Sequence, residues 1–366
     1  MKIPLVDLQV QYAGIKEEID AAVRFVLDSQ SFIGGHFVTA FEEEFSQFTG
    51  AQHVIGVANG TDALTLALRS LMLDIGEEVI VPANSFIATS EAVTNAGLKP
   101  VFCDVDPNTY LLDLNHVEEL ITASTGAIIP VHLYGQMVDM KAVKTISNKY
   151  KLTVIEDAAQ AHGVHYRGIT VGELSNLACY SFYPGKNLGA YGDGGAVTTN
   201  DENLARKVRM MANHGRVAKY DHEFEGVNSR LDSLQAAILS VKLQHLKTWN
   251  RQRRHAADIY RKQLADLDLP LPTSDEEGRH VYHLYVTRVK RRDKIVQAMK
   301  RDGIGVGVHY PIALPFLSAY RTHSYEPSDF PVTYKQMSQL ISLPIYPELT
   351  EEQIAHVVDA LRRNLR

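Results

Sequence analysis

From residue 54 to residue 199 the sequence alternates between short apolar runs and longer amphipathic stretches. Apolar runs bounded by polar turns are typical of buried strands, and the stretches between them have the length and spacing of helices. This βαβ alternation predicts an α/β fold with a mostly parallel sheet of about seven strands, covered by helices on both faces. The expected strands are 78–81, 100–105, 128–132, 153–155, 177–183 and 194–199, and the expected helices are 86–95, 114–121 and 140–150.

A different pattern begins near residue 231. From 231 to about 264, apolar residues form two stripes at helical spacing, which predicts a long buried helix with a wide apolar face. We expect this helix to join a large domain, residues 1–250, to a smaller C-terminal α+β domain, residues 251–366. The stretch 269–278, rich in Pro and acidic residues, is interpreted as a linker. In the smaller domain, strands are expected at 282–289 and 305–309, and helices at 294–301 and 351–361.

Composition and charge exclude several classes of protein. A chain that is 45% hydrophobic and 22% charged is typical of soluble globular proteins rather than disordered ones. The formal net charge of −6 argues against nucleic acid as a partner, because a phosphate backbone requires clustered cations. The one dense basic run, 251–255, falls in the long helix and is interpreted as a solvated face.

The N-terminus and the two cysteines point to a reducing compartment. Pro4 and Asp7 interrupt the N-terminal stretch, so it does not resemble a signal peptide, and no apolar run is long enough to span a bilayer. Cys103 and Cys179 lie in apolar runs without metal-ligand spacing, which favours buried thiols. We therefore expect a cytoplasmic protein without a metal site or a membrane partner.

One lysine, Lys186, lies in a glycine-rich turn (181–195) between two predicted strands. It has no helix face on which its ammonium could be solvated. Partial burial lowers the pKa of an ammonium group and favours the neutral amine that Schiff-base chemistry requires. Taken alone, the pattern also fits a surface lysine in a flexible turn.

Two further motifs favour the chemical interpretation. Asp157 follows an apolar strand and so is expected at the carboxyl edge of the sheet, where ligands of open α/β sheets bind. A carboxylate there can keep a pyridine nitrogen protonated, as in a pyridoxal phosphate (PLP) site, and the Gln160 amide can donate to the phenolic oxygen of the ring. Gly60 and Thr61 open a helix after a strand and a tight turn, which is an arrangement suited to a phosphate. Each residue also has a non-functional interpretation. Asp157 could cap a helix, Gln160 could be exposed, and Gly60 could lie in an ordinary turn.

With these motifs the chain resembles the DegT/StrS family of PLP-dependent nucleotide-sugar aminotransferases, which have the aspartate-aminotransferase fold. The matching stretches run nearly end to end. They are Pro4-Leu-Val-Asp-Leu, Gly60-Thr61, Val131-His-Leu-Tyr-Gly135, Glu156-Asp157, the Lys186 turn, Gly226-Val-Asn228-Ser-Arg-Leu-Asp and Leu343-Pro-Ile-Tyr-Pro347.

The resemblance implies a role for each matching residue. Lys186 is similar to the lysine that forms the Schiff base with PLP, Asp157 to the partner of the pyridine nitrogen and Gln160 to the partner of the phenolic oxygen. Asn228 resembles an asparagine that reaches the cofactor phosphate of the neighbouring subunit, which implies a homodimer with shared active sites. The remaining implied cofactor contacts are Gly60, Thr61 and Ser181 to the phosphate and Phe86 against the ring.

The Lys186 turn also resembles the branch of the family that aminates C3 of the sugar. The implied reaction is ping-pong transamination, through the amine form of the cofactor (PMP), of a dTDP-linked 3-keto-6-deoxyhexose, with L-glutamate as donor and 2-oxoglutarate as its product. The 3-amino sugar would serve deoxyamino-sugar synthesis, for example of lipopolysaccharide O-antigen. Lys219 and His309 are similar to family positions that contact the sugar nucleotide, and Tyr183 is near enough to Lys186 in sequence to contact the sugar. The alternatives are packing for Tyr183, a solvated loop lysine for Lys219 and a structural histidine for His309.

Three alternatives stay open. One is a C4-keto sugar as substrate, and a second is a UDP-linked 3-keto sugar. The third, from a different class, is a non-catalytic regulatory protein that binds PLP or a sugar nucleotide. Related sugar dehydratases carry histidine in place of the Schiff-base lysine, so the presence of Lys186 argues against that activity.

Overall fold

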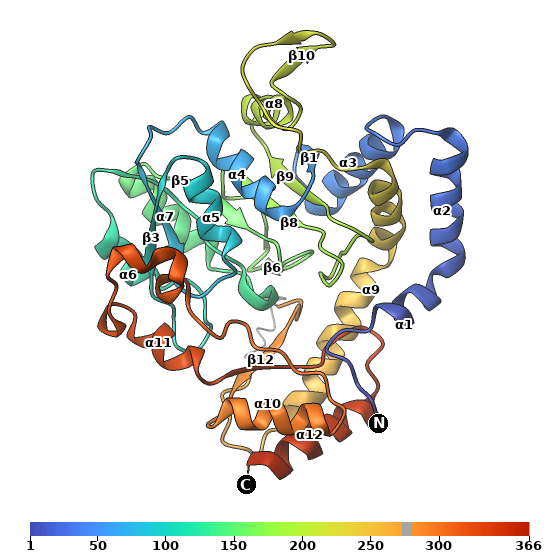
Figure 1. Cartoon of the computed structure of the whole chain (residues 1–366), viewed down its shortest axis with the longest axis vertical. Coiled ribbons are helices and arrows are strands. Elements are labelled where there is room, and N and C mark those ends of the chain that lie inside the picture. Colours follow the sequence, from blue (N-terminus) through green and yellow to red (C-terminus); the bar gives the residue numbers. More distant parts are fainter. Residues whose placement is uncertain (273–279, 366) are drawn as a thin grey trace.

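The structure is a computed structural model that describes residues 1–272 and 280–365. At its centre is a seven-stranded sheet in the order β1-β9-β8-β5-β4-β2-β3 (Figure 1). Strand β9 pairs antiparallel with β1 and β8, and the other pairs in this sheet are parallel. The predicted mostly parallel sheet is confirmed. Its strands are β1 (His53–Val57), β2 (Glu78–Pro82), β3 (Lys99–Cys103), β4 (Thr125–Ile128), β5 (Thr153–Asp157), β8 (Leu177–Ser181) and β9 (Gly195–Thr199).

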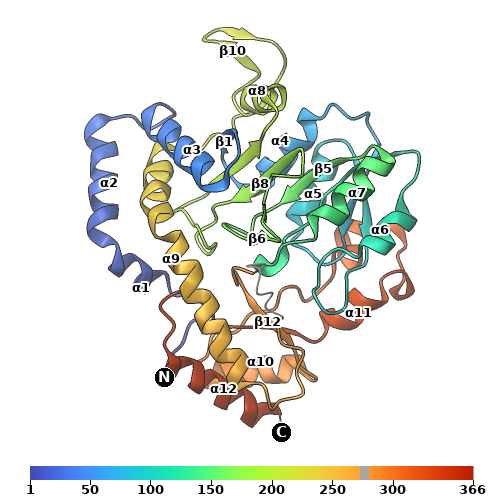
Figure 2. The ribbon, with the colours of Figure 1, turned by 180° about the vertical axis from the view of Figure 1, so that it is seen from behind.

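Alternate residues of the strands enter two different cores, as the period of a strand requires. Ile155 and Leu177 face a core formed with α4, α5 and α8, while Val154 and Tyr180 face a core formed with α3, α7 and α9. Helices therefore cover both faces of the sheet, as Figures 1 and 2 show. They are α3 (His36–Thr49), α4 (Gly60–Ser70), α5 (Ala88–Asn95), α6 (Leu114–Leu120), α7 (Met140–Tyr150), α8 (Glu202–Met211) and α9 (Ser233–Gln263).

The C-terminal half of α9 leaves the sheet and enters a separate core. There Tyr260 packs with the antiparallel pair β12 (Tyr285–Arg288) and β13 (Leu340–Leu343), and with α10 (Arg292–Arg301) and α12 (Glu351–Leu365). Ile3 from the N-terminus belongs to the same core. The predicted boundary between two domains at residue 250 stays a proposal. Beyond that boundary, Leu314, Tyr320 and Phe330 pack in the core of the large sheet, so the two parts share a core.

Smaller elements surround these two cores. Helices α1 (Leu8–Gly14) and α2 (Lys16–Ser29) lie along the outside of α9 (Figure 2). The hairpin of β10 (Arg216–Ala218) and β11 (Asp221–His222) projects from the body beyond α8 (Figure 1). Strands β6 (His165–Tyr166) and β7 (Ile169–Thr170) form a second short hairpin, and α11 (Pro331–Met337) follows three short 3-10 turns, Leu314–Phe316, Ser318–His323 and Pro327–Asp329.

Three local predictions were wrong, each for a physical reason. The strand expected at 128–132 ends at Ile128 and resumes only as a bridge between Val131 and Asp157, because Pro130 has no N–H to donate to a neighbouring strand. The strand expected at 305–309 is reduced to a bridge between Gly307 and Ser342, because Gly305 lies against the N-terminal segment. The basic run 251–255 is not simply solvated: Arg253 is 2% exposed and donates to two backbone carbonyls. Most of the predicted linker, residues 273–278, lies outside the described residues.

The described residues contain no disulfide bond, no cluster of potential metal ligands and no helix able to span a membrane. Cys103 and Cys179 are both buried and unpaired, and burial raises the pKa of each thiol. Outside residues 273–279 and 366, no group of three His, Cys, Asp or Glu side chains is placed to hold a metal ion. Within the same residues, no helix has both the length and the apolar character needed to cross a membrane.

Asp104 holds the returning C-terminal segment against the large sheet. Its carboxylate is buried and accepts hydrogen bonds from the Val332 N–H (2.9 Å) and from the N–H (2.9 Å) and hydroxyl of Thr333. It thereby caps α11, whose first N–H groups have no acceptor within the helix.

We predict that Asp104→Ala lowers the free energy of unfolding by about 2–4 kcal/mol, because several buried donors lose one shared acceptor. The midpoint of urea unfolding measures this change. Asp74→Ala is the control, since Asp74 is exposed and its carboxylate accepts no hydrogen bond within the described residues. Equal midpoints for the two variants would contradict the prediction.

Candidate active site

Asp157 is the last residue of β5 and lies at the carboxyl edge of the sheet, as predicted. Its carboxylate is 5% exposed and is fixed by two donors, the Thr89 hydroxyl (2.8 Å) and the Ala159 N–H (3.1 Å). Thr89, on α5, is in turn hydrogen-bonded to Ser85 at 2.7 Å. Sequence reasoning missed both hydroxyls, because nothing local marks a threonine inside a helix as the partner of a distant aspartate.

The turn before α4 lies directly beside the end of β8. Asn59 caps the helix by accepting from the Asp62 N–H (2.8 Å), which leaves the N–H groups of Gly60 and Thr61 without an intrahelical acceptor. A Cβ atom at Gly60 would lie 2.6 Å from the Cβ of Ser181, so only glycine permits this approach. The structure thus brings Gly60, Thr61 and Ser181 together around free N–H donors and a hydroxyl, a set that suits a phosphate.

Lys186 lies in the turn between β8 and β9, and no residue in the described part of the chain accepts a hydrogen bond from its ammonium. Burial lowers its pKa to about 8, and the nearby charge of Asp157 acts in the opposite direction. The backbone around it is closely packed, since a Cβ at Gly189 would lie 2.3 Å from the Pro184 carbonyl oxygen. A lysine amine with this pKa is partly neutral near pH 7–8 and can act as a nucleophile or move a proton.

Gln160 lies near Asp157 and is held in one orientation. Its Oε1 accepts from the Tyr134 N–H (2.6 Å), and its Nε2 donates to the Tyr310 hydroxyl (3.3 Å). The rings of Tyr310 and Phe86 are 6.0 Å apart, and Phe86 is 55% exposed. Gln160 Nε2 and the exposed ring of Phe86 therefore both lie beside Tyr310. Sequence reasoning did not select Tyr310.

Three histidines lie near enough to Lys186 for its charge to lower their pKa. Burial is the larger cause in each case, and the pKa falls to about 3 for His162, to about 4 for His309 and well below the ordinary value for His283. His309 also bonds to the Ser342 hydroxyl at 2.7 Å. All three rings are therefore neutral at pH 7, so they surround Lys186 without adding charge.

The other predicted site residues divide between this centre and the surface. Tyr183 is in the Lys186 turn, 61% exposed, with its N–H donated to the Ser181 hydroxyl (3.3 Å). Lys219 is exposed in the projecting β10–β11 hairpin, and Asn228 is exposed close to the base of that hairpin. Within one chain, the structure does not bring Lys219 to Lys186.

A fold with this sheet order, together with a lysine, an edge aspartate and a phosphate-binding turn, defines the class of PLP-dependent aminotransferases. Residues 13–362 match the model of the DegT/DnrJ/EryC1/StrS aminotransferase family. The chain therefore belongs to this family, which confirms the family and the cofactor, PLP, predicted from the sequence.

Similar proteins carry several names. A "pleiotropic regulatory protein" of Geobacillus stearothermophilus is 44% identical over 99% of this chain and 98% of its own. A UDP-N-acetyl-3-dehydro-α-D-glucosamine 3-aminotransferase of Acidithiobacillus ferrooxidans is 43% identical over 99% and 98%. A dTDP-3-amino-3,6-dideoxy-α-D-galactopyranose transaminase of Aneurinibacillus thermoaerophilus is 45% identical over 99% of both chains.

Two solved structures agree closely with this fold. S. venezuelae DesV, in complex with a ketimine intermediate, superposes with a TM-score of 0.96, at 41% identity over 99% of this chain and 98% of its own. NtdA from Bacillus subtilis, with bound cofactor PMP, gives a TM-score of 0.90, at 34% identity over 99% and 83%.

The residues present here fit PLP. The close approach of Gly60 to Ser181 leaves a cradle of N–H groups for the phosphate. Asp157 has one carboxylate oxygen fixed by Thr89 and the other by Ala159, so the group keeps one orientation toward a pyridine nitrogen. Gln160 Nε2 can donate to the phenolic oxygen, and Phe86 offers an exposed ring. These roles for individual residues remain predictions.

We predict that the amine of Lys186 becomes reactive with a midpoint near pH 8 in the cofactor-free protein, whereas an ordinary lysine has a pKa of about 10.4. Asp157→Asn should move the midpoint to lower pH. The Asp157 carboxylate stabilises the ammonium form and raises the pKa of Lys186, and the variant lacks that charge. Competitive acetylation at several pH values, read by mass spectrometry of the Lys186 peptide, measures both midpoints. A midpoint above pH 10, or a shift to higher pH in the variant, would count against the assigned environment.

Proposed function

We propose that this chain transfers an amino group to C3 of a nucleotide-linked 3-keto-6-deoxyhexose. The observation that carries the proposal is Lys186, whose ammonium has no described acceptor and a pKa lowered beside Asp157, five residues after the Ser181 that lies against Gly60. A lysine that served only as a surface charge would have an ordinary pKa, whereas this half-buried amine is partly neutral near pH 8. The reaction class is transamination.

PLP, when bound, supplies an electron sink for the negative charge that develops at the substrate carbon. Asp157 supports this chemistry by holding a proton on the pyridine nitrogen, and Thr89 keeps its carboxylate in place. Lys186 Nζ takes a proton from one carbon and returns it to another, which its pKa of about 8 allows near neutral pH. Gly60, Thr61 and Ser181 hold the phosphate, so the reacting atoms stay beside Lys186.

The preference for a dTDP-linked 3-keto sugar rests on the Lys186 turn and on relatives named as transaminases of dTDP-3-amino sugars. Tyr183 and His309 lie where they could contact the sugar, one exposed in the Lys186 turn and the other bonded to Ser342. A UDP-linked 3-keto sugar is the second candidate, because relatives named for UDP-linked substrates match equally fully. L-Glutamate as donor and deoxyamino-sugar or O-antigen synthesis as the purpose are further parts of the proposal.

We also propose a homodimer with shared active sites in the cytoplasm. Asn228 and Lys219 are exposed, and each would serve the site of the other subunit. Large apolar side chains on α2 and just after it also face outward, among them Phe25 (60% exposed) and Ile33 (56% exposed). Exposed apolar surface of this kind is typical of a protein interface.

To test the reaction, the amine-loaded enzyme is mixed with dTDP- and UDP-linked 3-keto and 4-keto hexoses, and the return of the cofactor absorbance is followed. We expect the fastest return with a dTDP-3-keto-6-deoxyhexose and none with Lys186→Ala, which lacks the proton-transferring amine. Faster return with a UDP-linked or 4-keto sugar would replace the proposed substrate. Absence of cofactor absorbance in the purified protein would favour the non-catalytic alternative in which the chain binds a sugar nucleotide without PLP.

The shared site is tested by mixing Lys186→Ala and Asn228→Ala protomers. If Asn228 serves the partner's site, each mixed dimer has one site with both lesions and one with neither. We therefore expect activity to appear on mixing, above that of either parent. Asn228→Ala should also weaken PLP binding about ten- to a hundredfold, because it removes a hydrogen bond to a charged phosphate. No gain on mixing would refute the shared site.

A further inference from the structure

A cavity of about 340 Å³ lies on the α9 side of the sheet, apart from the residues proposed to hold PLP or sugar. Its walls come from the end of α3, the turn after β5, the β6–β7 hairpin and the middle of α9. A volume of this size is at the lower end of the range for small-molecule sites. The proposed transamination gives it no role.

One wall of this cavity is cationic. Lys247, Arg251 and Arg254 line it from α9, and their spacing of four and three residues places them on one face of the helix. Within residues 1–272 and 280–365, none of the three forms an ion pair. The nearest acidic residue along the helix, Asp258, pairs with Arg261 at 2.8 Å, and its charge only partly offsets the lowering of the Arg254 pKa.

The three charges repel one another: Lys247 and Arg251 are exposed at the rim of the cavity, and Arg254 is half-buried. The pKa of the Arg254 guanidinium is lowered, first by burial and then by the charge of Arg251. Like charges at this helical spacing destabilise a helix, and the partial burial of Arg254 strengthens its repulsion from Arg251. A bound anion would reverse the sign of this interaction, and arginine forks match the geometry of a phosphate group.

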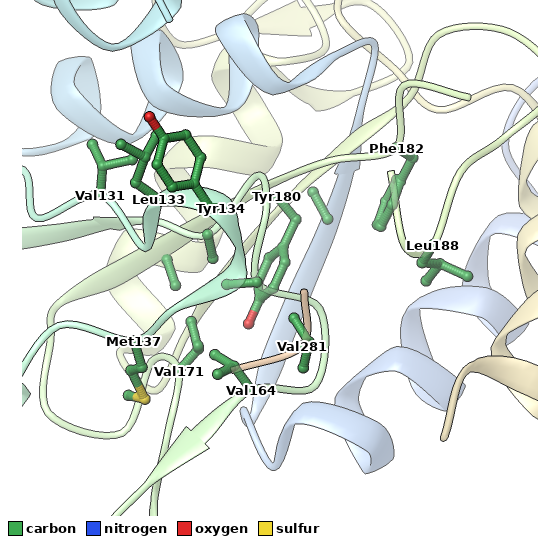
Figure 3. Close-up of a cluster of buried hydrophobic side chains, with 14 of the residues drawn as sticks. Val131, Leu133, Tyr134, Met137, Val164, Val171, Tyr180, Phe182, Leu188 and Val281 are labelled. Atoms are coloured by element: carbon green, nitrogen blue, oxygen red, sulfur yellow. The ribbon is translucent and has the colours of Figure 1, made fainter. Parts of the chain in front are cut away.

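Another part of the lining is apolar and aromatic. Figure 3 shows the side chains of Val164, Val171 and Tyr180 gathered in one part of the buried cluster, and all three line the cavity. Phe48 completes this wall, with its ring 5.9 Å from Lys247 Nζ. A ligand that fits both walls therefore needs an anionic head and an apolar body.

The floor of the cavity reaches the segment that carries Lys186. Asn250 lines the cavity, is 3% exposed, donates to the His162 carbonyl (2.8 Å) and accepts from the Asn187 amide (2.9 Å). Both of its hydrogen-bonding groups are used within the protein. The ligand charge must therefore be met by the cations of α9 rather than by this amide.

We propose that this cavity is a second ligand site that binds a small organic phosphate, with the phosphate on Lys247, Arg251 and Arg254 and the organic body against Phe48, Val164 and Tyr180. The site is separate from the phosphate-binding turn at Gly60. Phenyl phosphate combines the two features that the walls require, an anion and a small aromatic body, and serves as the probe.

The test is calorimetric titration of phenyl phosphate into PLP-loaded enzyme, in which the cofactor already occupies the Gly60 turn. We compare the wild type with Arg251→Gln/Arg254→Gln. The matched control is Lys300→Gln/Arg301→Gln, which loses the same charge from exposed positions on α10. We expect saturable binding to wild type and control, and binding at least about tenfold weaker to the Arg251/Arg254 variant, because hydrogen bonds to charged groups are lost.

Equal affinity for all three proteins, or no saturable binding to the wild type, would overturn the proposal. Inorganic phosphate and phenol form the second arm: each should bind at least about tenfold more weakly than phenyl phosphate, since each lacks one of the two features. Inorganic phosphate that binds as tightly as phenyl phosphate would overturn the organic ligand class. Equal thermal unfolding of the two variants shows that binding, not folding, has changed. If the arginine variant is less stable than its control, Phe48→Ala is the second test. It should weaken the binding of phenyl phosphate but not of inorganic phosphate.

Discussion

The partial burial of one lysine side chain, Lys186, is the constraint on which the site depends. Burial lowers the pKa of Lys186 to about 8, and Asp157 is the opposite charge that keeps it from falling further. Asp157 ends β5 and Lys186 lies in the turn that follows β8, so their proximity requires β5 and β8 to be adjacent in the sheet, as they are. The sheet order is therefore a condition for the chemistry.

Helix α9 fixes the Lys186 turn and joins it to the C-terminal core. Lys242 is 1% exposed and donates to the Gly189 carbonyl (2.5 Å), while Asn250 bonds to the side chain of Asn187 (2.9 Å). Eleven residues after Lys242, Arg253 donates to the carbonyls of Tyr282 and Ile345. Burying these polar side chains is costly unless they are bonded, so each ties the turn or the core to one helix.

The sequence predicted the parts of the site that are local, and missed those that depend on tertiary contacts. The strand before Asp157 and the helix start at Gly60 each have a local pattern, and the family resemblance placed Lys186. Thr89, Tyr134 and Tyr310 were not predicted, because each reaches the site from a segment whose own pattern is ordinary. For the same reason Arg253 was taken for a solvated residue: a basic run on a helix does not reveal which carbonyls lie opposite it.

The segment around Asn228 shows how a second subunit could be coupled to the first. Ser229 is 1% exposed, and its hydroxyl donates to Asp62 (2.6 Å) and accepts from the Ala58 N–H (3.2 Å), which flank the Gly60 turn. The adjacent residue, Asn228, is exposed. Consecutive residues of one extended segment thus face opposite ways, one to the phosphate-binding turn of its own chain and the other outward. In the proposed dimer, a shift of this segment would alter both phosphate sites, so cofactor binding and association would be linked.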